Sequence, residues 1–91
     1  MQMLTKQNEK DLGKKVIKFF TPWSNWSWYV TEGEEESNGD WMFFGLVEGF
    51  EKEWGSFRLS DLTSVTGPMG FKIERDRWFD TPVKEFTAEN S

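Results

Sequence analysis

The residues best suited to chemistry stand in one charged cluster, in which Glu74, Arg75, Asp76 and Arg77 follow one another. On a β-strand successive side chains point to opposite faces, so the two carboxylates share one face and the two arginines share the other. Two carboxylates on one face can divide the acid and base roles of a glycosidase. Such a pair is much more often part of a cross-strand salt-bridge ladder, and that is the interpretation we favour.

Histidine and cysteine are both absent from the sequence. Their absence removes the commonest general base, thiolate nucleophiles, disulfides and zinc sites built on these residues. No substrate follows from any pairing of the remaining carboxylate candidates, which are Glu32, Asp40, Glu74 and Asp76. We therefore expect a protein that is not an enzyme and that holds no cofactor.

A run of acidic residues occupies positions 32 to 40 and contains the turn-forming pair Asn38-Gly39. We predict a solvent-exposed acidic hairpin loop here. The run lacks the ligand spacing of a calcium loop, so no metal site is expected. Two interpretations stay open. The commoner one is a solvated loop, and the sharper one is a row of carboxylates that imitates nucleic-acid phosphates and enters the basic groove of a partner.

Aromatic residues are concentrated between positions 21 and 29, which hold three Trp and one Tyr. Trp26 and Trp28 alternate with polar residues and are expected to be core residues on one strand face. Trp23 follows Pro22 in a loop, beside the hydrogen-bonding side chains of Ser24 and Asn25. Because a loop tryptophan combines a flat face with an N–H donor, Trp23 and Asn25 are candidates for binding a partner.

The 91 residues carry a net charge of -5, which disfavours a protein that binds nucleic acid mainly by bulk electrostatics. The length is that of a single domain, residues 1–91. Nine Phe, six Trp and one Tyr supply enough apolar area for a core despite the small size. Neither a membrane span nor a secretory signal is recognisable, which predicts a cytoplasmic protein.

Apolar alternation and turn residues predict an α+β fold, with a small antiparallel sheet of about five strands and short flanking helices. Residues 1–13 are expected to hold a short helix that begins after Thr5 and ends at Gly13, and residues 14–80 the sheet. Ser60 is expected to cap a single helical turn. Residues 81–91 are expected to hold a C-terminal turn that begins at Thr81 and Pro82, followed by a tail that frays from Thr87 onward. The expected strands are residues 16 to 20, 26 to 30, 41 to 47, 54 to 59 and 71 to 79.

Several uncommon sequence words occur in order along the chain. They are KFFTPWSNWSWY at residues 18 to 29, FFGLV at 43 to 47, EWG at 53 to 55, GP at 67 and 68, and IERD at 73 to 76. In these words and in their spacing the chain resembles, from about residue 3 to residue 86, the family known as domain of unknown function 2958. The stretch before Val16 departs from the family, since it is shorter and lacks the customary Leu-Pro and Tyr residues.

The resemblance implies a biological context and no chemistry, because the family has no established catalytic or binding residues. Members are proteins of bacteria, plasmids and phages, are common on mobile elements, and are sometimes joined to antirestriction-type domains. This context raises the expectation of a role in the contest between mobile elements and host defences.

Two hypotheses of function follow. The first is a non-enzymatic protein-interaction module from a mobile genetic element or phage, which inhibits a host defence nuclease or a CRISPR or restriction complex. Its partner is a host protein, and the acids would face a basic groove with Trp23 and Trp41 as anchors. The candidate partner-binding residues are Trp23, Asn25, Glu34, Glu35, Glu36, Asp40, Trp41 and Arg75.

The alternative is a single-stranded nucleic-acid-binding module that uses stacked aromatics. Trp23, Trp26 or Tyr29 would stack on bases, and a lysine-rich segment would contact phosphates, namely Lys10, Lys14, Lys15 and Lys18. A homodimer is a further expectation, because residues 41 to 47 are apolar on both strand faces and a second copy would cover the extra face.

Overall fold

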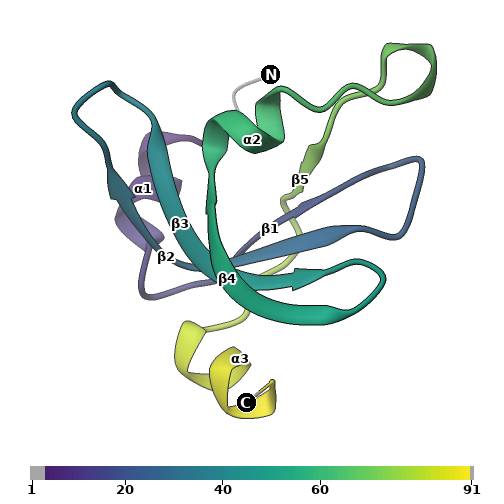
Figure 1. Ribbon diagram of the computed structural model, residues 1–91. Coiled ribbons are helices and arrows are strands. Elements are labelled where there is room, and N and C mark those ends of the chain that lie inside the picture. Colours follow the sequence, from purple (N-terminus) through teal and green to yellow (C-terminus); the bar gives the residue numbers. More distant parts are fainter. Residues whose placement is uncertain (1–3, 91) are drawn as a thin grey trace.

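The computed structural model describes residues 4–90 and shows a single antiparallel sheet with short helices at its margins (Figure 1). The strands are β1 (Ile17–Phe20), β2 (Ser27–Glu35), β3 (Trp41–Glu48), β4 (Lys52–Arg58) and β5 (Glu74–Asp76). The helices are α1 (Lys6–Asp11), α2 (Leu59–Thr63) and α3 (Val83–Glu89), with a 3-10 turn η1 (Pro68–Gly70). The predicted α+β class with five strands is confirmed.

The strands lie in the order β4-β3-β2-β1-β5, so the first four form a meander and β5 returns to pair with β1. Each pairing is antiparallel, as predicted for the sheet as a whole. The β2–β3 turn lies at one end of these strands, and the β1–β2 and β3–β4 turns lie at the other end (Figure 1).

The main core lies on one face of the sheet. Its centre is formed by three side chains with no solvent exposure, Phe19, Val30 and Phe43. The rest of this core consists of Leu4, Ile17, Phe57, Leu62 and Ile73. The chain segments that precede and follow the four-stranded meander therefore both contribute to it. At about 25 cal/mol per Å² of buried apolar surface, these large side chains supply most of the driving force for folding.

A second, smaller core lies on the opposite face, where α3 packs beneath the sheet (Figure 1). Leu46 of β3 and Phe86 of α3 are both buried there, together with Val16. β3 is therefore apolar on both faces because the chain itself covers both at its centre, as expected for a central strand. The covering by α3 removes the reason for a second copy at Leu46, and the homodimer stays a prediction.

The first helix begins as predicted. The Thr5 hydroxyl accepts a hydrogen bond from the Asn8 N–H at 3.2 Å, and the Asn8 side chain accepts one from the Thr5 N–H at 3.1 Å. This reciprocal pair is a capping box, which satisfies two backbone donors at the helix start.

The predicted starts of the two later helices are wrong by one or two residues. α2 is capped by Arg58, whose N–H donates to the Asp61 carboxylate at 3.0 Å, so Ser60 lies inside the helix and its side chain is used elsewhere. α3 has Pro82 as its N-cap, and it is a helix of seven residues with Phe86 buried. The prediction of a frayed tail is wrong up to Asn90. The burial of Phe86 and a hydrogen bond from Trp54 Nε1 to the Asn90 carbonyl at 3.2 Å hold this segment in place. Ser91 lies outside the described residues.

Two strands differ from their expected ranges by more than two residues at one or both ends. β5 covers only three of the nine predicted residues, because beyond Asp76 the chain no longer pairs with β1 in the same register. The acidic segment was expected to be a loop, yet residues 32 to 35 belong to β2. Pairing with the apolar β3 stabilises the extended backbone, while the carboxylates point into solvent, and this tertiary effect outweighs the weak strand propensity of Glu.

Candidate protein-interaction surface on the acidic hairpin

The β2–β3 hairpin divides its acids between two faces. Cross-strand partners lie on the same face, and the register pairs Glu32 with Phe44, Glu34 with Met42, and Glu35 with Trp41. A β-bulge at Thr31, whose hydroxyl donates to the Phe44 carbonyl at 3.1 Å, sets this alternation. Glu32 and Glu34 therefore lie on the face of α3, and Glu35 lies on the face of the main core.

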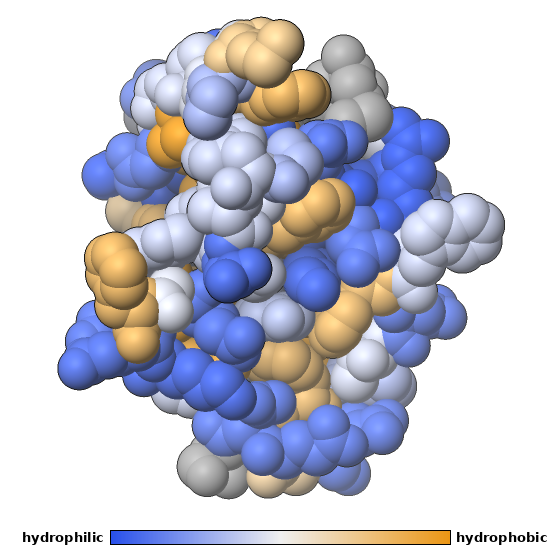
Figure 2. Space-filling view, turned by 90° about the vertical axis from the view of Figure 1, so that its right-hand side faces the viewer, coloured by the Kyte–Doolittle hydropathy of each residue, from blue (hydrophilic) through white to orange (hydrophobic). Residues whose placement is uncertain are grey.

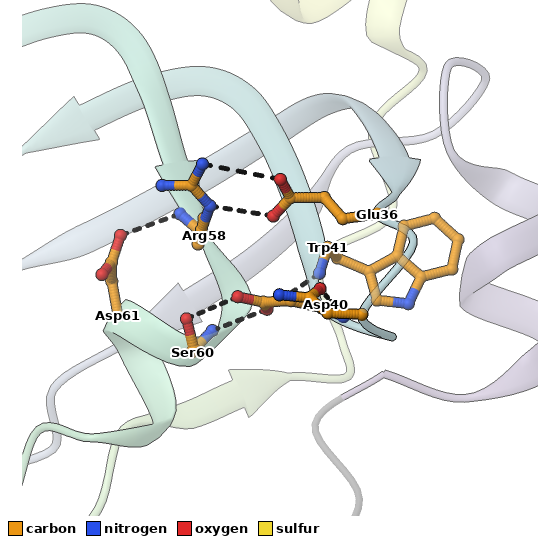
Figure 3. Close-up of polar contacts among 7 residues, drawn as sticks. Glu36, Asp40, Trp41, Arg58, Ser60 and Asp61 are labelled. Atoms are coloured by element: carbon orange, nitrogen blue, oxygen red, sulfur yellow. Dashed lines mark hydrogen bonds and ion pairs between the residues drawn. The ribbon is translucent and has the colours of Figure 1, made fainter.

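Glu36 and Asp40 form the turn of the hairpin and hold it against β4 and α2 (Figure 3). Glu36 accepts from Arg58 Nε at 2.8 Å and from Nη2 at 3.5 Å. This carboxylate raises the pKa of Arg58, first through the hydrogen bond and then through its charge. The turn itself closes with Gly39 at φ 87°, a conformation that favours glycine.

Asp40 links the turn to the start of α2. Its carboxylate accepts hydrogen bonds from the Ser60 hydroxyl at 2.6 Å, the Ser60 N–H at 3.1 Å and the Trp41 N–H at 2.8 Å (Figure 3). The Ser60 hydroxyl is the main reason that the pKa of Asp40 is lowered. A carboxylate with three donors is bound within the fold, so Asp40 braces the hairpin and is not a free contact for a partner.

Three hairpin acids remain unpaired within residues 4–90. Glu32, Glu34 and Glu35 are exposed and make no ion pair with the described residues. Beside the first two lies Phe44, which is 40% exposed and stacks on Trp54 with ring centroids 6.0 Å apart. We call Glu32, Glu34, Met42 and Phe44 the hairpin patch. It combines an aromatic centre with free negative charge, the composition of a surface that meets a basic partner.

The eight predicted binding residues do not form one site. Glu34, Glu35, Glu36, Asp40 and Trp41 lie together on the hairpin, whereas Trp23 and Asn25 lie in the β1–β2 turn at the other end of β2. Arg75 lies on β5 and donates to the Asn8 side chain of α1. The arrangement with Trp23 and Trp41 as two anchors around one acidic groove is therefore wrong.

The two predicted anchors are also engaged in packing. Trp41 packs against the main core and stacks on Phe43 with ring centroids 6.4 Å apart. Trp23 packs against the same core and against Gly67, where a Cβ would lie 2.5 Å from its ring atoms. Both rings serve the fold, and Asn25, which is exposed, stays available beside them.

The most exposed large apolar residues are not among those that the sequence pattern singles out. Trp78 and Phe50 are each 94% exposed, and Met69, at φ 58°, is 95% exposed. On the face shown in Figure 2, hydrophobic residues form separate patches with charged and polar residues between them. A signal for Trp78 does exist, because Asp76 precedes it by two residues and accepts its N–H at 2.9 Å, which turns the chain away from the strand.

The charged cluster at β5 forms one rung of a salt-bridge ladder. Asp76 is paired with Lys18 of β1, with the Lys18 Nζ 3.8 Å from the carboxylate. Glu74 faces Phe20 and makes no ion pair with another described residue. The favoured interpretation, a cross-strand salt-bridge ladder, therefore fits Asp76, whereas Glu74 lies opposite an aromatic residue.

No cluster of three or more metal-ligating side chains occurs among residues 4–90. In the same part of the chain, every helix is too short or too polar to cross a membrane.

A family model described as "Protein of unknown function (DUF2958)" matches residues 1–87. No curated protein and no solved structure matches the chain. Because the family model covers nearly the whole sequence, the chain belongs to the DUF2958 family.

Proposed function

We propose that the protein is a non-enzymatic interaction module of a mobile genetic element or phage, and that it inhibits a host defence nuclease, such as a restriction or CRISPR complex. The hairpin patch would occupy a basic surface that the nuclease uses to hold nucleic acid. The observation that carries this proposal is the pair of unpaired carboxylates, Glu32 and Glu34, beside the exposed ring of Phe44.

The geometry of the hairpin supports charge mimicry. Glu32 and Glu34 are two residues apart on one strand face, so their side chains stand about 6.8 Å apart along the strand. The backbone beneath them is fixed by the β3 ladder and by the Glu36–Arg58 ion pair. A rigid display of like charges lowers the entropy lost on binding, and it attracts a basic groove over a distance of about 8 Å at physiological salt.

The aromatic part of the patch gives the contact a second source of affinity. Phe44 is held by its stack on Trp54, and Trp54 is held in turn by its hydrogen bond to Asn90. A ring that is fixed before binding and half open to solvent is typical of an interface hot spot.

The experiment is a pull-down of the tagged protein from lysate of a bacterial host, treated with nuclease, followed by purification of the captured nuclease and an assay of its activity. The test variant carries E32Q and E34Q. The matched control carries E51Q and E53Q, which remove the same charge at exposed positions outside the hairpin. We expect the test variant to bind about tenfold more weakly or worse, to lose most of the salt dependence, and to inhibit less, while the control variant is unchanged.

Equal affinity and equal inhibition by the two variants would refute the role of the hairpin patch. Capture of a partner without any effect on its nuclease activity would refute the inhibitor proposal and leave only a binding protein.

The alternative function, binding of single-stranded nucleic acid, requires different residues from those first expected. Trp26 stacks on Trp28 at 6.0 Å and meets Phe50 edge-on, and Tyr29 stacks on Phe86 at 5.0 Å. These rings offer little free face for a base. A specific observation favours another location, because the exposed Trp78 borders a groove that contains two arginines.

A further inference from the structure

The segment between β5 and α3 leaves the sheet in a bulge. β1 pairs with β5 at Lys18 and Asp76, and its next contact with that chain segment is the bridge between Lys15 and Pro82. Two residues separate these contacts on the β1 side and five on the other, so residues 77 to 81 have no room within the ladder. Bulges of this kind aim side chains away from a sheet.

The bulge presents Trp78 on a fixed base. The Trp78 N–H bonds to the Asp76 carboxylate at 2.9 Å, and the next residue, Phe79, packs against Tyr29 with ring centroids 5.5 Å apart. On the far side, the Val16 N–H donates to the Thr81 carbonyl at 2.9 Å. Trp78 is thus held by its own N–H and by the packing of Phe79, while its ring is 94% exposed. So large an apolar surface in water is suited to stacking on a ligand.

A groove of about 330 Å³ lies between this bulge and α1. Arg75 reaches into it, half-buried, and donates to the Asn8 carboxamide oxygen without an ion pair to any described residue. Burial, and next the charge of Arg77, lower the pKa of Arg75. A half-buried guanidinium beside a second one is stabilised by an anion, and the planar fork of arginine suits phosphate.

The acids that line the same groove are already engaged. Asp76 accepts from the Trp78 N–H and lies 3.8 Å from Lys18, and Asp80 lies 3.1 Å from Lys15. Asp11 accepts from the Gln7 side chain at 3.2 Å. These pairings reduce the repulsion that an incoming phosphate would meet. The electrostatic potential in the groove is therefore less negative than the net charge of the molecule suggests.

We propose that this groove binds one nucleotide unit of single-stranded nucleic acid, with a base stacked on Trp78 and the adjoining phosphate at Arg75 and Arg77. The volume is within the range of small-ligand sites. A nucleotide joins a flat ring and an anion within one residue, which is the combination that the groove displays, whereas an acidic peptide would use the arginines and leave Trp78 unused. This inference develops the alternative function and is independent of the hairpin patch, with which the groove shares no residue.

The test is fluorescence anisotropy of a labelled oligothymidylate of about twelve nucleotides, titrated with the whole protein at low salt. The variants are Trp78→Ala, Trp78→Phe and Arg77→Gln. The matched control is Phe50→Ala, which removes an equally exposed ring at the other side of the sheet. We expect Trp78→Ala to weaken binding about tenfold or more and Trp78→Phe to restore most of it. Arg77→Gln should reduce the salt slope by about one, and Phe50→Ala should change nothing.

Three results would overturn the proposal. One is wild-type binding by Trp78→Ala. Another is competition by polyglutamate as strong as that by unlabelled oligothymidylate, which would assign the groove to acidic protein segments. The third is equal loss of binding in the E32Q and E34Q variant, which would move the contact to the hairpin. Failure here leaves the inhibitor proposal untouched, because that proposal is judged on the hairpin variants alone.

Discussion

Gly45 of β3 lies directly against the backbone of Tyr29 in β2, so closely that a Cβ on Gly45 would stand 1.9 Å from the Tyr29 carbonyl oxygen. No shift of a side chain can relieve such a contact, since the obstacle is main chain. The glycine therefore permits the close approach of two central strands, which carry the main core on one face and the second core on the other.

Gly45→Ala is expected to destabilise the fold by at least about 3 kcal/mol, because the strands must move apart and the packing of both cores is lost. Gly55→Ala, directly across the ladder in β4, is the control, since a Cβ there would meet no atom within 4 Å. It should change the free energy of unfolding by no more than about 0.5 kcal/mol. Urea denaturation followed by tryptophan fluorescence measures both, and equal effects would contradict this explanation.

Phe43→Ala should cost about 3 to 5 kcal/mol, because Phe43 is fully buried and contacts Phe19, Trp41 and Phe57 through its ring. Phe50→Ala removes the same side chain at a position that is 94% exposed, and it should leave stability within about 0.5 kcal/mol of the wild type. The comparison uses thermal unfolding monitored by circular dichroism. A small loss of stability for Phe43→Ala would mean that the neighbouring core side chains move in to fill the space that the ring leaves.

Asp40 predicts a dependence of stability on pH. Its pKa is lowered in the folded state, so its contribution is present above the unfolded value of 3.8 and is lost as the pH falls through the lower, folded value. Asp40→Asn should therefore weaken the fold at neutral pH and flatten the decline of the urea midpoint between about pH 5 and about pH 3. Ser60→Ala should act in the same direction, since the Ser60 hydroxyl is the main cause of the shift. An unchanged pH profile in both variants would show that another carboxylate dominates.

Trp23→Ala separates a structural role from a binding role. Because Trp23 fills the space above Gly67 and packs on the main core, its removal should cost about 2 kcal/mol of stability. Gly67→Ala should be destabilising as well, because the new Cβ would overlap the ring. Affinity for a captured partner, measured below the unfolding temperature, should stay unchanged for Trp23→Ala. Lost affinity at wild-type stability would instead restore Trp23 as an anchor.

Local sequence predicts much of this fold. The alternation of apolar and polar residues around Trp28, the Asn38-Gly39 turn and the Thr5 cap all follow from side chains within a few residues of one another. The strand in residues 32 to 35 could not be predicted in this way. Its extended backbone depends on a partner strand, and four charged or glycine residues give no apolar alternation of their own.

The candidate sites depend even more on distant contacts. Trp23 is predicted to be a free anchor, but its ring packs against Gly67, which lies 44 positions later in the chain. The Asp76 turn marks where the chain leaves the strand, but the exposure of the Trp78 ring results from a mismatch between the Lys18–Asp76 and Lys15–Pro82 contacts, which join residues far apart in the sequence. Composition alone identifies the hairpin acids. Which of them are unpaired and which are bound within the fold depends on the positions of Arg58 and Ser60, which hold Glu36 and Asp40.

The strand order has a consequence for the path of folding. β1 to β4 form three successive hairpins whose closing loops are short, so their contacts can form early and quickly. β5 must find β1 across an intervening chain that includes the whole meander, as the pairing of Phe20 with Glu74 shows. A nascent chain could thus complete four strands before the last third has left the ribosome, and docking of residues 74 to 90 would be the late step. Protection of backbone amides from hydrogen exchange should then appear later in residues 74 to 90 than in the meander.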